Sequence, residues 1–144
     1  MKDVVFEANV ELKEGLTFDA KTRNFSLLID EPENLGGKDK GPNPVEYLLF
    51  ALGGCFGIVT QFVAKEMNIK IESLKINLKG ELNPMRFMGK NFSERAGYKN
   101  IDLLIDIKSN ESRERLEELI KKVEERCPVS DNIRNPTPVN INLK

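Results

Sequence analysis

The two cysteines, Cys55 and Cys127, are the residues of this 144-residue chain with the most distinctive chemistry. Cys55 follows two glycines, Gly53 and Gly54, which leave space around its sulfur, and Cys127 precedes a proline and a polar turn. Cysteine sulfur serves either as a reactive thiolate or as a small buried apolar group. Both interpretations stay open from the residue types, because separation along the sequence says nothing about the distance between the sulfurs.

The chain contains no histidine. This absence excludes Ser-His-Asp and Cys-His catalysis and most zinc and non-haem iron sites, which depend on imidazole. Two cysteines without histidine are also a poor ligand set for zinc. Any catalysis would then use cysteine, carboxylate, lysine, arginine or tyrosine groups, or a cofactor. We expect no metal site and assign no cofactor to the chain.

The charge of the chain is balanced, with 22 basic and 23 acidic residues and a net charge of -1. This balance gives no support for nucleic acid or an anionic membrane as a partner. The N-terminus lacks the long apolar region of a signal peptide, so we expect a cytoplasmic protein. In that reducing compartment, the two cysteines are not expected to form a structural disulfide.

Two segments that must position the cysteines are predicted to be helices. The first, residues 45–68, has Asn43 as its N-cap and only one charged residue, Glu46, before position 65. It is too short and too interrupted to span a bilayer, so we expect a buried core helix, or a core helix that also forms a subunit interface. The second, residues 112–126, is amphipathic and has Ser112 as a plausible N-cap.

Segments with alternating apolar residues predict strands around these helices. The order of elements is then three strands, a helix, two strands, a helix and a final strand, which is an α+β arrangement in a single domain over residues 1–144. The predicted strands are residues 3–13, 16–20, 25–30, 70–82, 98–108 and 139–143, with a loop at 31–44 and a turn at 129–134.

Both cysteine segments resemble motifs of the OsmC/Ohr family, and the predicted order of elements is also that of the family. The resemblance implies an OsmC-like α+β fold, with antiparallel sheets around a buried central helix and a second amphipathic helix, in an intertwined homodimer. A homodimer also fits the apolar first helix, which needs more cover than so small a domain provides. The motifs are Gly41-Pro42-Asn43-Pro44, leading through Leu48-Leu49 to Gly53-Gly54-Cys55, and Cys127-Pro128-Val129-Ser130-Asp131-Asn132-Ile133-Arg134.

The resemblance also implies an activity, because the family's best-known members are thiol-dependent peroxidases that reduce organic hydroperoxides. Cys55 would be the peroxidatic thiolate, which becomes a sulfenic acid, and Cys127 would be the resolving thiol, which forms a disulfide with it. A dithiol reductant would then restore the pair. We further assign Phe56, beside Cys55, and Met85 and Phe87, in the loop between two strands, to substrate binding.

The sequence departs from the peroxidase pattern at the acid and at the arginine. Val45 stands where those members have a glutamate, and the acid, Glu46, follows one position later. The early region offers Arg23 as its only arginine, and we assign it to substrate binding. Arg86, Arg95 and Arg134 are other candidate cations. This chain therefore resembles a subgroup without the standard Arg/Glu pair.

Three interpretations follow from these departures. The first is a thiol peroxidase with Cys55, Cys127 and Glu46 as catalytic residues. The second is a protein of the same fold without peroxidase activity, which binds an apolar or thiol-reactive small molecule or senses the redox state. The third is a structural dimer with buried cysteines.

Overall fold

The computed structural model describes residues 2–144. By their internal contacts these residues form two compact units, which divide after Leu48. The first unit contains one antiparallel sheet, and the second contains helices and another antiparallel sheet. Helices and antiparallel sheets together confirm the predicted α+β class, while the single domain over residues 1–144 stays a prediction.

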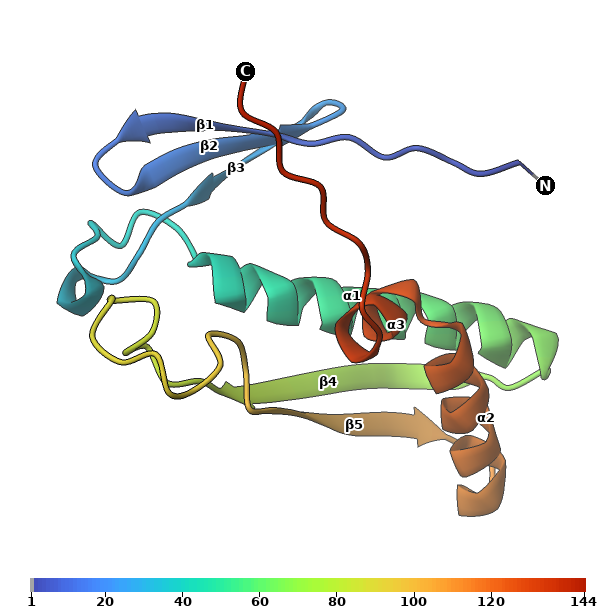
Figure 1. Ribbon diagram of the computed structural model, residues 1–144. Helices are drawn as coiled ribbons and strands as arrows, with labels where there is room; N and C mark the ends of the chain where they lie inside the picture. The colour runs from blue at the N-terminus through green and yellow to red at the C-terminus, as the bar shows by residue number, and fades with distance from the viewer. Residues whose placement is uncertain (1) are drawn as a thin grey trace. The chain divides into compact units, whose positions relative to one another are not determined.

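The first unit contains a meander of β1 (Asn9–Glu14), β2 (Thr17–Thr22) and β3 (Phe25–Ile29), paired in that order (Figure 1). The turn between β1 and β2 uses Gly15 at a φ of 55°, which glycine adopts without steric cost. The meander is confirmed, but β1 starts at Asn9. Residues 3–8, which the sequence predicts as its beginning, are exposed and find no partner strand in the described part of the chain.

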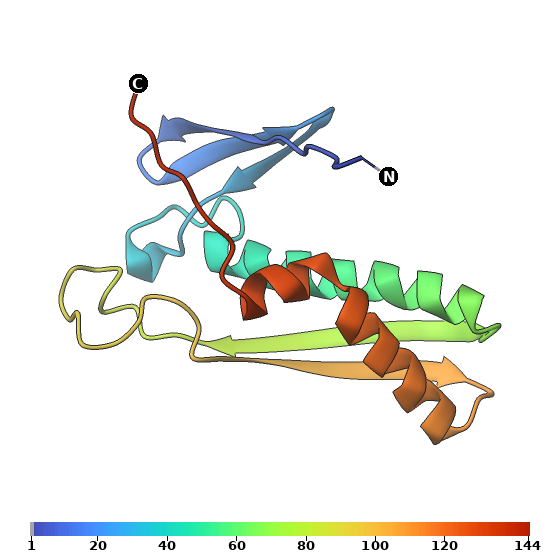
Figure 2. The same ribbon diagram turned by 45° about the vertical axis from the view of Figure 1, so that its right-hand side comes forward.

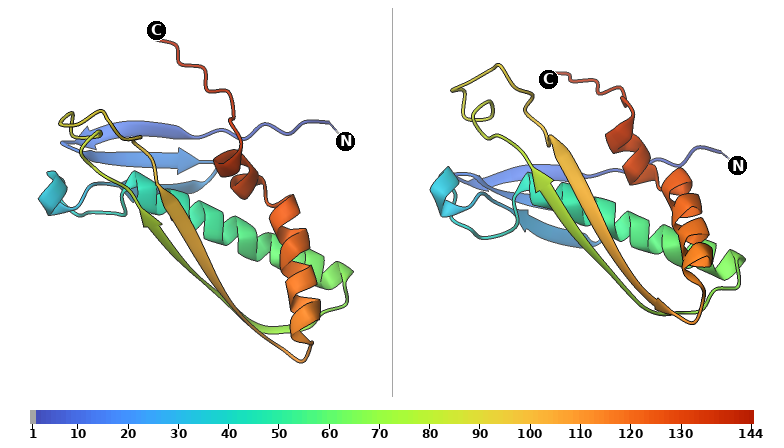
Figure 3. Two further views of the ribbon diagram at one scale, coloured as in Figure 1. Left: turned by 60° about the horizontal axis from the view of Figure 1, so that its bottom comes forward. Right: turned by 90° about the horizontal axis from the view of Figure 1, so that it is seen from below.

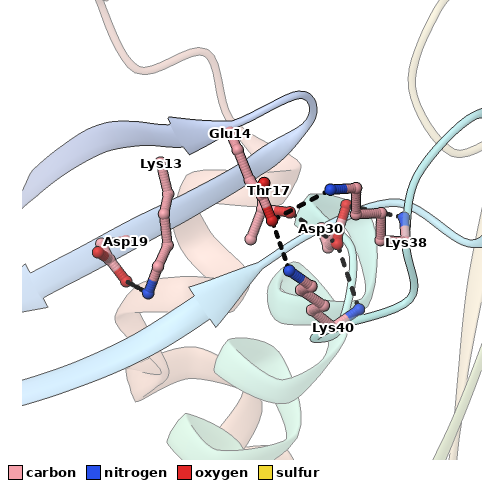
Figure 4. Close-up of polar contacts among 7 residues, drawn as sticks. All are labelled: Lys13, Glu14, Thr17, Asp19, Asp30, Lys38 and Lys40. Atoms are coloured by element: carbon pink, nitrogen blue, oxygen red, sulfur yellow. Dashed lines mark hydrogen bonds and ion pairs between the residues drawn. The ribbon is translucent and has the colours of Figure 1, made fainter.

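A buried carboxylate, Asp30, organises the loop that follows β3 (Figure 4). Its oxygens accept a hydrogen bond from the Thr17 hydroxyl at 3.0 Å and bonds from the backbone N–H groups of Glu31, Lys38 and Lys40 at 2.8, 3.4 and 3.2 Å. Burial raises the pKa of Asp30, but these hydrogen bonds together hold that pKa below its usual value. The loop thus folds around a buried carboxylate whose oxygens accept four hydrogen bonds.

Two lysines of this loop form ion pairs with Glu14 at the end of β1 (Figure 4). The ammonium groups of Lys40 and Lys38 lie 2.6 and 3.1 Å from the Glu14 carboxylate, and they lower its pKa to about 2. Between β3 and these lysines the chain forms the short 3-10 helix η1 (Glu33–Leu35). The loop before the first long helix is therefore an ordered structure.

In the second unit, helix α1 lies along the antiparallel hairpin of β4 (Ile71–Glu81) and β5 (Asn100–Ser109) (Figure 1). Helix α1 (Pro44–Glu66) begins in the first unit and continues unbroken through its glycines. Helix α2 (Arg113–Arg126) lies near the C-terminal end of α1 (Figures 2 and 3). Its N-cap is Ser112, as predicted, and the Ser112 side chain accepts a hydrogen bond from the Arg115 N–H.

The helices and the inner faces of the strands share one apolar core. The sequence of α2 places Leu119, Val123 and Cys127 four residues apart, and all three are buried against α1. Alternate residues of β5 face the same core, whereas Leu104 points outward and is 70% exposed. The core consists of Phe56, Val63, Ala64, Ile69, Leu119, Val123 and Cys127.

Helix α1 is buried on one side only, although its apolar sequence predicts burial all round. Leu52, Phe56 and Val63 face the core, while Ile58 and Phe62 are each 61% exposed. The residue spacing explains this division, because a helix that rests on one sheet face turns its other side away from that sheet. An apolar helix face thus remains uncovered within the second unit.

By length and composition alone, α1 could cross a membrane. It has 23 residues and contains an 18-residue window with a mean hydropathy of 1.8. The prediction that the segment is too short and interrupted is therefore wrong, because the glycines do not break the helix. Core helices of globular proteins meet the same criterion, and α1 supplies Phe56, Val63 and Ala64 to the core of the second unit. We accordingly interpret α1 as a core helix.

The C-terminal part of the chain differs from the prediction in two ways. Residues 129–134, predicted as a turn, belong to the short helix α3 (Pro128–Arg134), which has proline at its first position. The predicted strand 139–143 does not form, because it has no neighbouring strand in the described part of the chain. Its alternating residues Val139, Ile141 and Leu143 are exposed.

Candidate active site

The fold of the second unit brings the two cysteines together. Cys55 lies in the middle of α1, and Cys127 is the residue between α2 and α3. Their Sγ atoms are 3.2 Å apart, and the Cys127 thiol donates toward the Cys55 sulfur. Both cysteines are free, and a disulfide requires a sulfur separation of about 2.05 Å. A side-chain movement of roughly 1 Å would therefore join them.

The two sulfurs lie in different surroundings. Cys127 is only 1% exposed, whereas Cys55 is half-buried. Burial raises the pKa of the Cys127 thiol, against hydrogen bonds from the backbone N–H groups of Ser130 and Val129, and the nearby Cys55 sulfur raises it further. Cys127 is thus held in its protonated form beside a sulfur that is more accessible from solvent.

A cavity of about 290 Å³ is lined by residues of α1, β5, α2 and α3, but by neither cysteine. Phe56, which follows Cys55, forms part of its wall, and Ser130, whose N–H bonds the Cys127 sulfur, forms another part. Six of its nine lining residues are apolar, so the cavity suits an apolar group with a small polar end. Its lining residues are Leu52, Phe56, Ile101, Leu103, Ile105, Glu124, Ser130, Ile133 and Arg134.

One ion pair belongs to this cavity, formed by Arg134 of α3 and Glu124 of α2. The Arg134 Nη1 lies 2.5 Å from the Glu124 Oε1. A second ion pair connects the ends of α1 and α2, where Arg126 binds Glu66 through two hydrogen bonds. Arg126 directly precedes Cys127 in the chain, but neither Arg126 nor Glu66 lines the cavity.

The sequence candidate Glu46 acts as a helix cap in the structure. Its carboxylate accepts a hydrogen bond from the Asn43 N–H at 2.8 Å, and the Asn43 side chain accepts one from the Glu46 N–H at 3.0 Å. This reciprocal arrangement is a capping box, and it confirms Asn43 as the N-cap. The local role of Glu46 is therefore to satisfy the first turn of α1.

The other sequence candidates lie on turns and loops. Arg23 sits at the tip of the β2–β3 hairpin with a φ of 51°, and its guanidinium lies 5.0 Å from the Phe25 ring centre. Met85 and Phe87 lie in the loop between β4 and β5, where both side chains are exposed. Of the predicted substrate-binding residues, Phe56 is the one that lines this cavity.

Several residues of this site are not singled out by the sequence. Leu52 lies one helical turn before Cys55, and Glu124 lies about one turn before Cys127, so spacing on the helices could have indicated both. Ser130 and Ile133 belong to the short helix α3, which the sequence predicts as a turn. Within residues 2–144, no three histidine, cysteine or acidic side chains cluster in a way that could hold a metal.

Comparison with known proteins places this chain among established relatives. A sequence model of the OsmC-like protein family matches residues 37–142. The organic hydroperoxide resistance protein OhrB of Bacillus subtilis is 29% identical over 97% of this chain and 98% of its own length. A hydroperoxide reductase of Mycoplasma genitalium is 24% identical over 98% of this chain and 95% of its own.

Solved structures support the same placement. An OsmC-like protein from Mycoplasma pneumoniae superimposes with a TM-score of 0.81 at 24% identity, and the match covers 94% of this chain and 91% of that protein. The fold, with antiparallel sheets and a central helix beside an amphipathic one, agrees with this neighbour. Because the sequence model covers most of the chain and the fold agrees, the chain belongs to the OsmC-like protein family.

Proposed function

We propose that this protein is a thiol-dependent peroxidase that reduces organic hydroperoxides through Cys55 and Cys127. The observation that carries this proposal is the 3.2 Å separation of the two sulfurs, which are 72 positions apart in the chain. Two relatives named for hydroperoxide resistance and hydroperoxide reduction support the same substrate class. The mainly apolar cavity, whose lining includes Phe56 next to Cys55 in the chain, supports an alkyl substrate.

The reaction proceeds in three balanced steps. The Cys55 thiolate attacks the terminal oxygen of the hydroperoxide, the O–O bond breaks, and a sulfenic acid and an alkoxide form; the alkoxide takes up a proton and leaves as the alcohol. The Cys127 thiol then attacks the sulfenic sulfur, which forms the disulfide and releases water. A dithiol reductant restores both thiols by exchange, as expected in the cytoplasm.

The protonated state of Cys127 suits the resolving role. A thiol that keeps its proton does not compete with Cys55 for the peroxide, because the thiolate is the reacting form. Its donated hydrogen bond points at the Cys55 sulfur and stabilises negative charge there. Cys55, which is half-buried and more exposed than Cys127, takes the role of the peroxidatic residue.

The test is thiol titration before and after one equivalent of cumene hydroperoxide. We expect two thiols lost per chain in the native protein and no intramolecular disulfide in Cys55→Ser. In Cys127→Ser, we expect one thiol lost and a sulfenic acid that a dimedone probe can trap. If the native protein loses thiols to cumene hydroperoxide no faster than free cysteine does, the peroxidase proposal is refuted.

A second function is favoured by the local role of Glu46. Val45 stands at the position of the family's glutamate, and the neighbouring Glu46 carboxylate is used by the helix cap. A protein of this fold without peroxidase activity would bind an apolar or thiol-reactive small molecule in the same cavity. It would show thiol loss with an electrophile but none with a hydroperoxide.

We also propose that the protein is a homodimer, as the apolar side of α1 suggests. Ile58 and Phe62 are exposed on that side, and only 28% of the most apolar 18-residue window of α1 is buried. A Cβ atom at Gly54, on the same side, would meet nothing within 4 Å, so the glycine leaves room for a close neighbour outside the chain. The unpaired segment 139–143 could add to a sheet of the second copy.

Light scattering at micromolar concentration tests the dimer. We expect twice the mass of the 16.3 kDa chain, and we expect Ile58→Asp to shift the protein toward the monomer. Leu104→Asp is the matched control, because Leu104 is at least as exposed as Ile58 but lies on the outer face of β5. A native monomer would contradict the proposal.

A further inference from the structure

The loop between β4 and β5, residues 82–99, differs in charge from the chain as a whole. It has four basic residues and one acid, which gives it a net charge of +3, whereas the whole chain has a net charge of -1. The balanced total therefore hides a local excess of positive charge, which attracts negatively charged surfaces. The charged residues of the loop are Arg86, Lys90, Glu94, Arg95 and Lys99.

Most of this positive charge is not neutralised within the described part of the chain. The Lys99 ammonium lies 2.5 Å from the Glu94 carboxylate, so this pair has no net charge. Lys90 and Arg95 form no ion pair with any described residue. The Arg86 guanidinium donates to two carbonyl oxygens of the loop, which are neutral acceptors. Three cations thus remain available to an external partner.

The same loop exposes four large apolar side chains within eight positions of the sequence. Phe87 and Phe92 are 63% and 64% exposed, and Met85 and Met88 are 38% and 42% exposed. Single exposed apolar residues are ordinary on a protein surface, but several large ones in one loop indicate an interaction surface.

Hydrogen bonds give this loop a defined shape. The Met85 carbonyl accepts bonds from the N–H groups of Lys90 and Asn91 at 2.8 and 3.2 Å, and Gly89 adopts the positive φ of 69° that this turn requires. The two carbonyl bonds of Arg86 join one side of the loop to the other. The loop projects beyond the ends of β4 and β5, so its apolar side chains are presented at the tip of the hairpin (Figure 3).

We propose that the loop of residues 82–99 docks on the surface of a lipid bilayer that contains anionic lipids. Phe87 and the two methionines enter the boundary between headgroups and acyl chains, where apolar side chains leave water. Lys90 and Arg95 stay at the level of the headgroups and attract their phosphates. This surface is separate from the cysteine pair, and the inference does not depend on the proposed peroxidase activity.

The side chains of the loop favour lipid over single-stranded nucleic acid, which also binds surfaces with aromatic and basic residues. Nucleic acid needs open aromatic faces on which its bases stack. The Arg86 guanidinium lies 5.6 Å from the Phe92 ring centre and covers one face of that ring. Two of the four exposed apolar side chains are methionines, which offer no aromatic face but enter an apolar phase readily.

Sedimentation of the 144-residue chain with lipid vesicles tests the inference. We expect binding to vesicles of phosphatidylcholine mixed with phosphatidylglycerol, weaker binding to phosphatidylcholine alone, and weaker binding to both at high salt. Phe87→Ser should lower the partition coefficient about tenfold, the effect of keeping one apolar side chain out of the bilayer. Lys90→Gln should lower it about fivefold on the anionic vesicles, the effect of one charge near their surface.

Two matched control variants should bind vesicles as the native protein does. Leu104→Ser removes an apolar side chain that is 70% exposed on the outer face of β5, and Lys70→Gln removes an exposed lysine at the opposite end of the hairpin. The inference is overturned if the native protein binds no vesicles, or if the controls lose as much binding as the loop variants. Binding of single-stranded oligouridylate without binding of vesicles also overturns it. So does a lower mass of Phe87→Ser in light scattering, because the loop would then contact a second copy of the chain.

Discussion

Leu119 is the core residue whose replacement should most clearly report on the packing behind Cys127. Its side chain is 0% exposed and lies two turns before Cys127 on the buried side of α2. Leu119→Ala removes buried methyl groups and leaves a cavity, which costs about 2–5 kcal/mol of unfolding free energy. Alanine has the higher helix propensity, so none of this loss comes from the helix itself.

Urea unfolding followed by circular dichroism measures the loss. With a slope of about 2 kcal/mol per molar urea, a cost of about 3 kcal/mol lowers the midpoint by roughly 1.5 M. All variants are compared at one protein concentration, because association contributes to stability by mass action.

Leu104→Ala is the matched control for Leu119→Ala, because the same side chain is lost from a site that is 70% exposed. Its effect should stay within about 0.5 kcal/mol. A loss below about 1 kcal/mol for Leu119→Ala, or equal losses for the two variants, would refute the described core.

Three further predictions concern the loop before α1 and the buried thiol. In Gly37→Ala the new Cβ would lie 1.8 Å from the Glu31 carbonyl oxygen, so we expect a loss of about 1–3 kcal/mol in thermal or urea unfolding, and unchanged stability would contradict the loop geometry. The folded pKa of Asp30 is lowered, so its contribution to stability is complete above the ordinary value of 3.8 and is lost as the pH falls through the folded value. Asp30→Asn should therefore flatten the acid side of the stability profile, and an unchanged profile would count against this role. Burial raises the pKa of Cys127, so alkylation of the Cys55→Ser protein should show a midpoint above the ordinary value of 9.0, and a midpoint at or below 9.0 would contradict it.

The order of elements follows from sequence patterns that are local. Alternation predicts the meander and the β4–β5 hairpin, and a helical stripe with Ser112 as N-cap predicts α2. The capping box of Asn43 and Glu46 is also local, which is why Asn43 is found correctly as the N-cap of α1.

Errors arise where an element depends on a distant partner. Segments 3–8 and 139–143 alternate like strands, but no strand of the described chain lies beside them. A strand needs a partner for its backbone hydrogen bonds, and alternation within a segment does not show whether such a partner exists. Helix α3 was not predicted from the sequence for a different reason. A seven-residue helix has too little periodicity to be distinguished from a turn.

The sequence by itself determined which residues could react, since the lack of histidine leaves the two cysteines as the strongest nucleophiles. The resemblance of both cysteine motifs also pointed to the family that the comparisons show. Only the tertiary structure decided that the sulfurs lie 3.2 Å apart, that Cys127 is the buried one and that Arg134 lines a cavity together with Phe56. These features depend on how α1, α2, α3 and β5 pack, and packing between distant segments leaves no periodic signal in the chain.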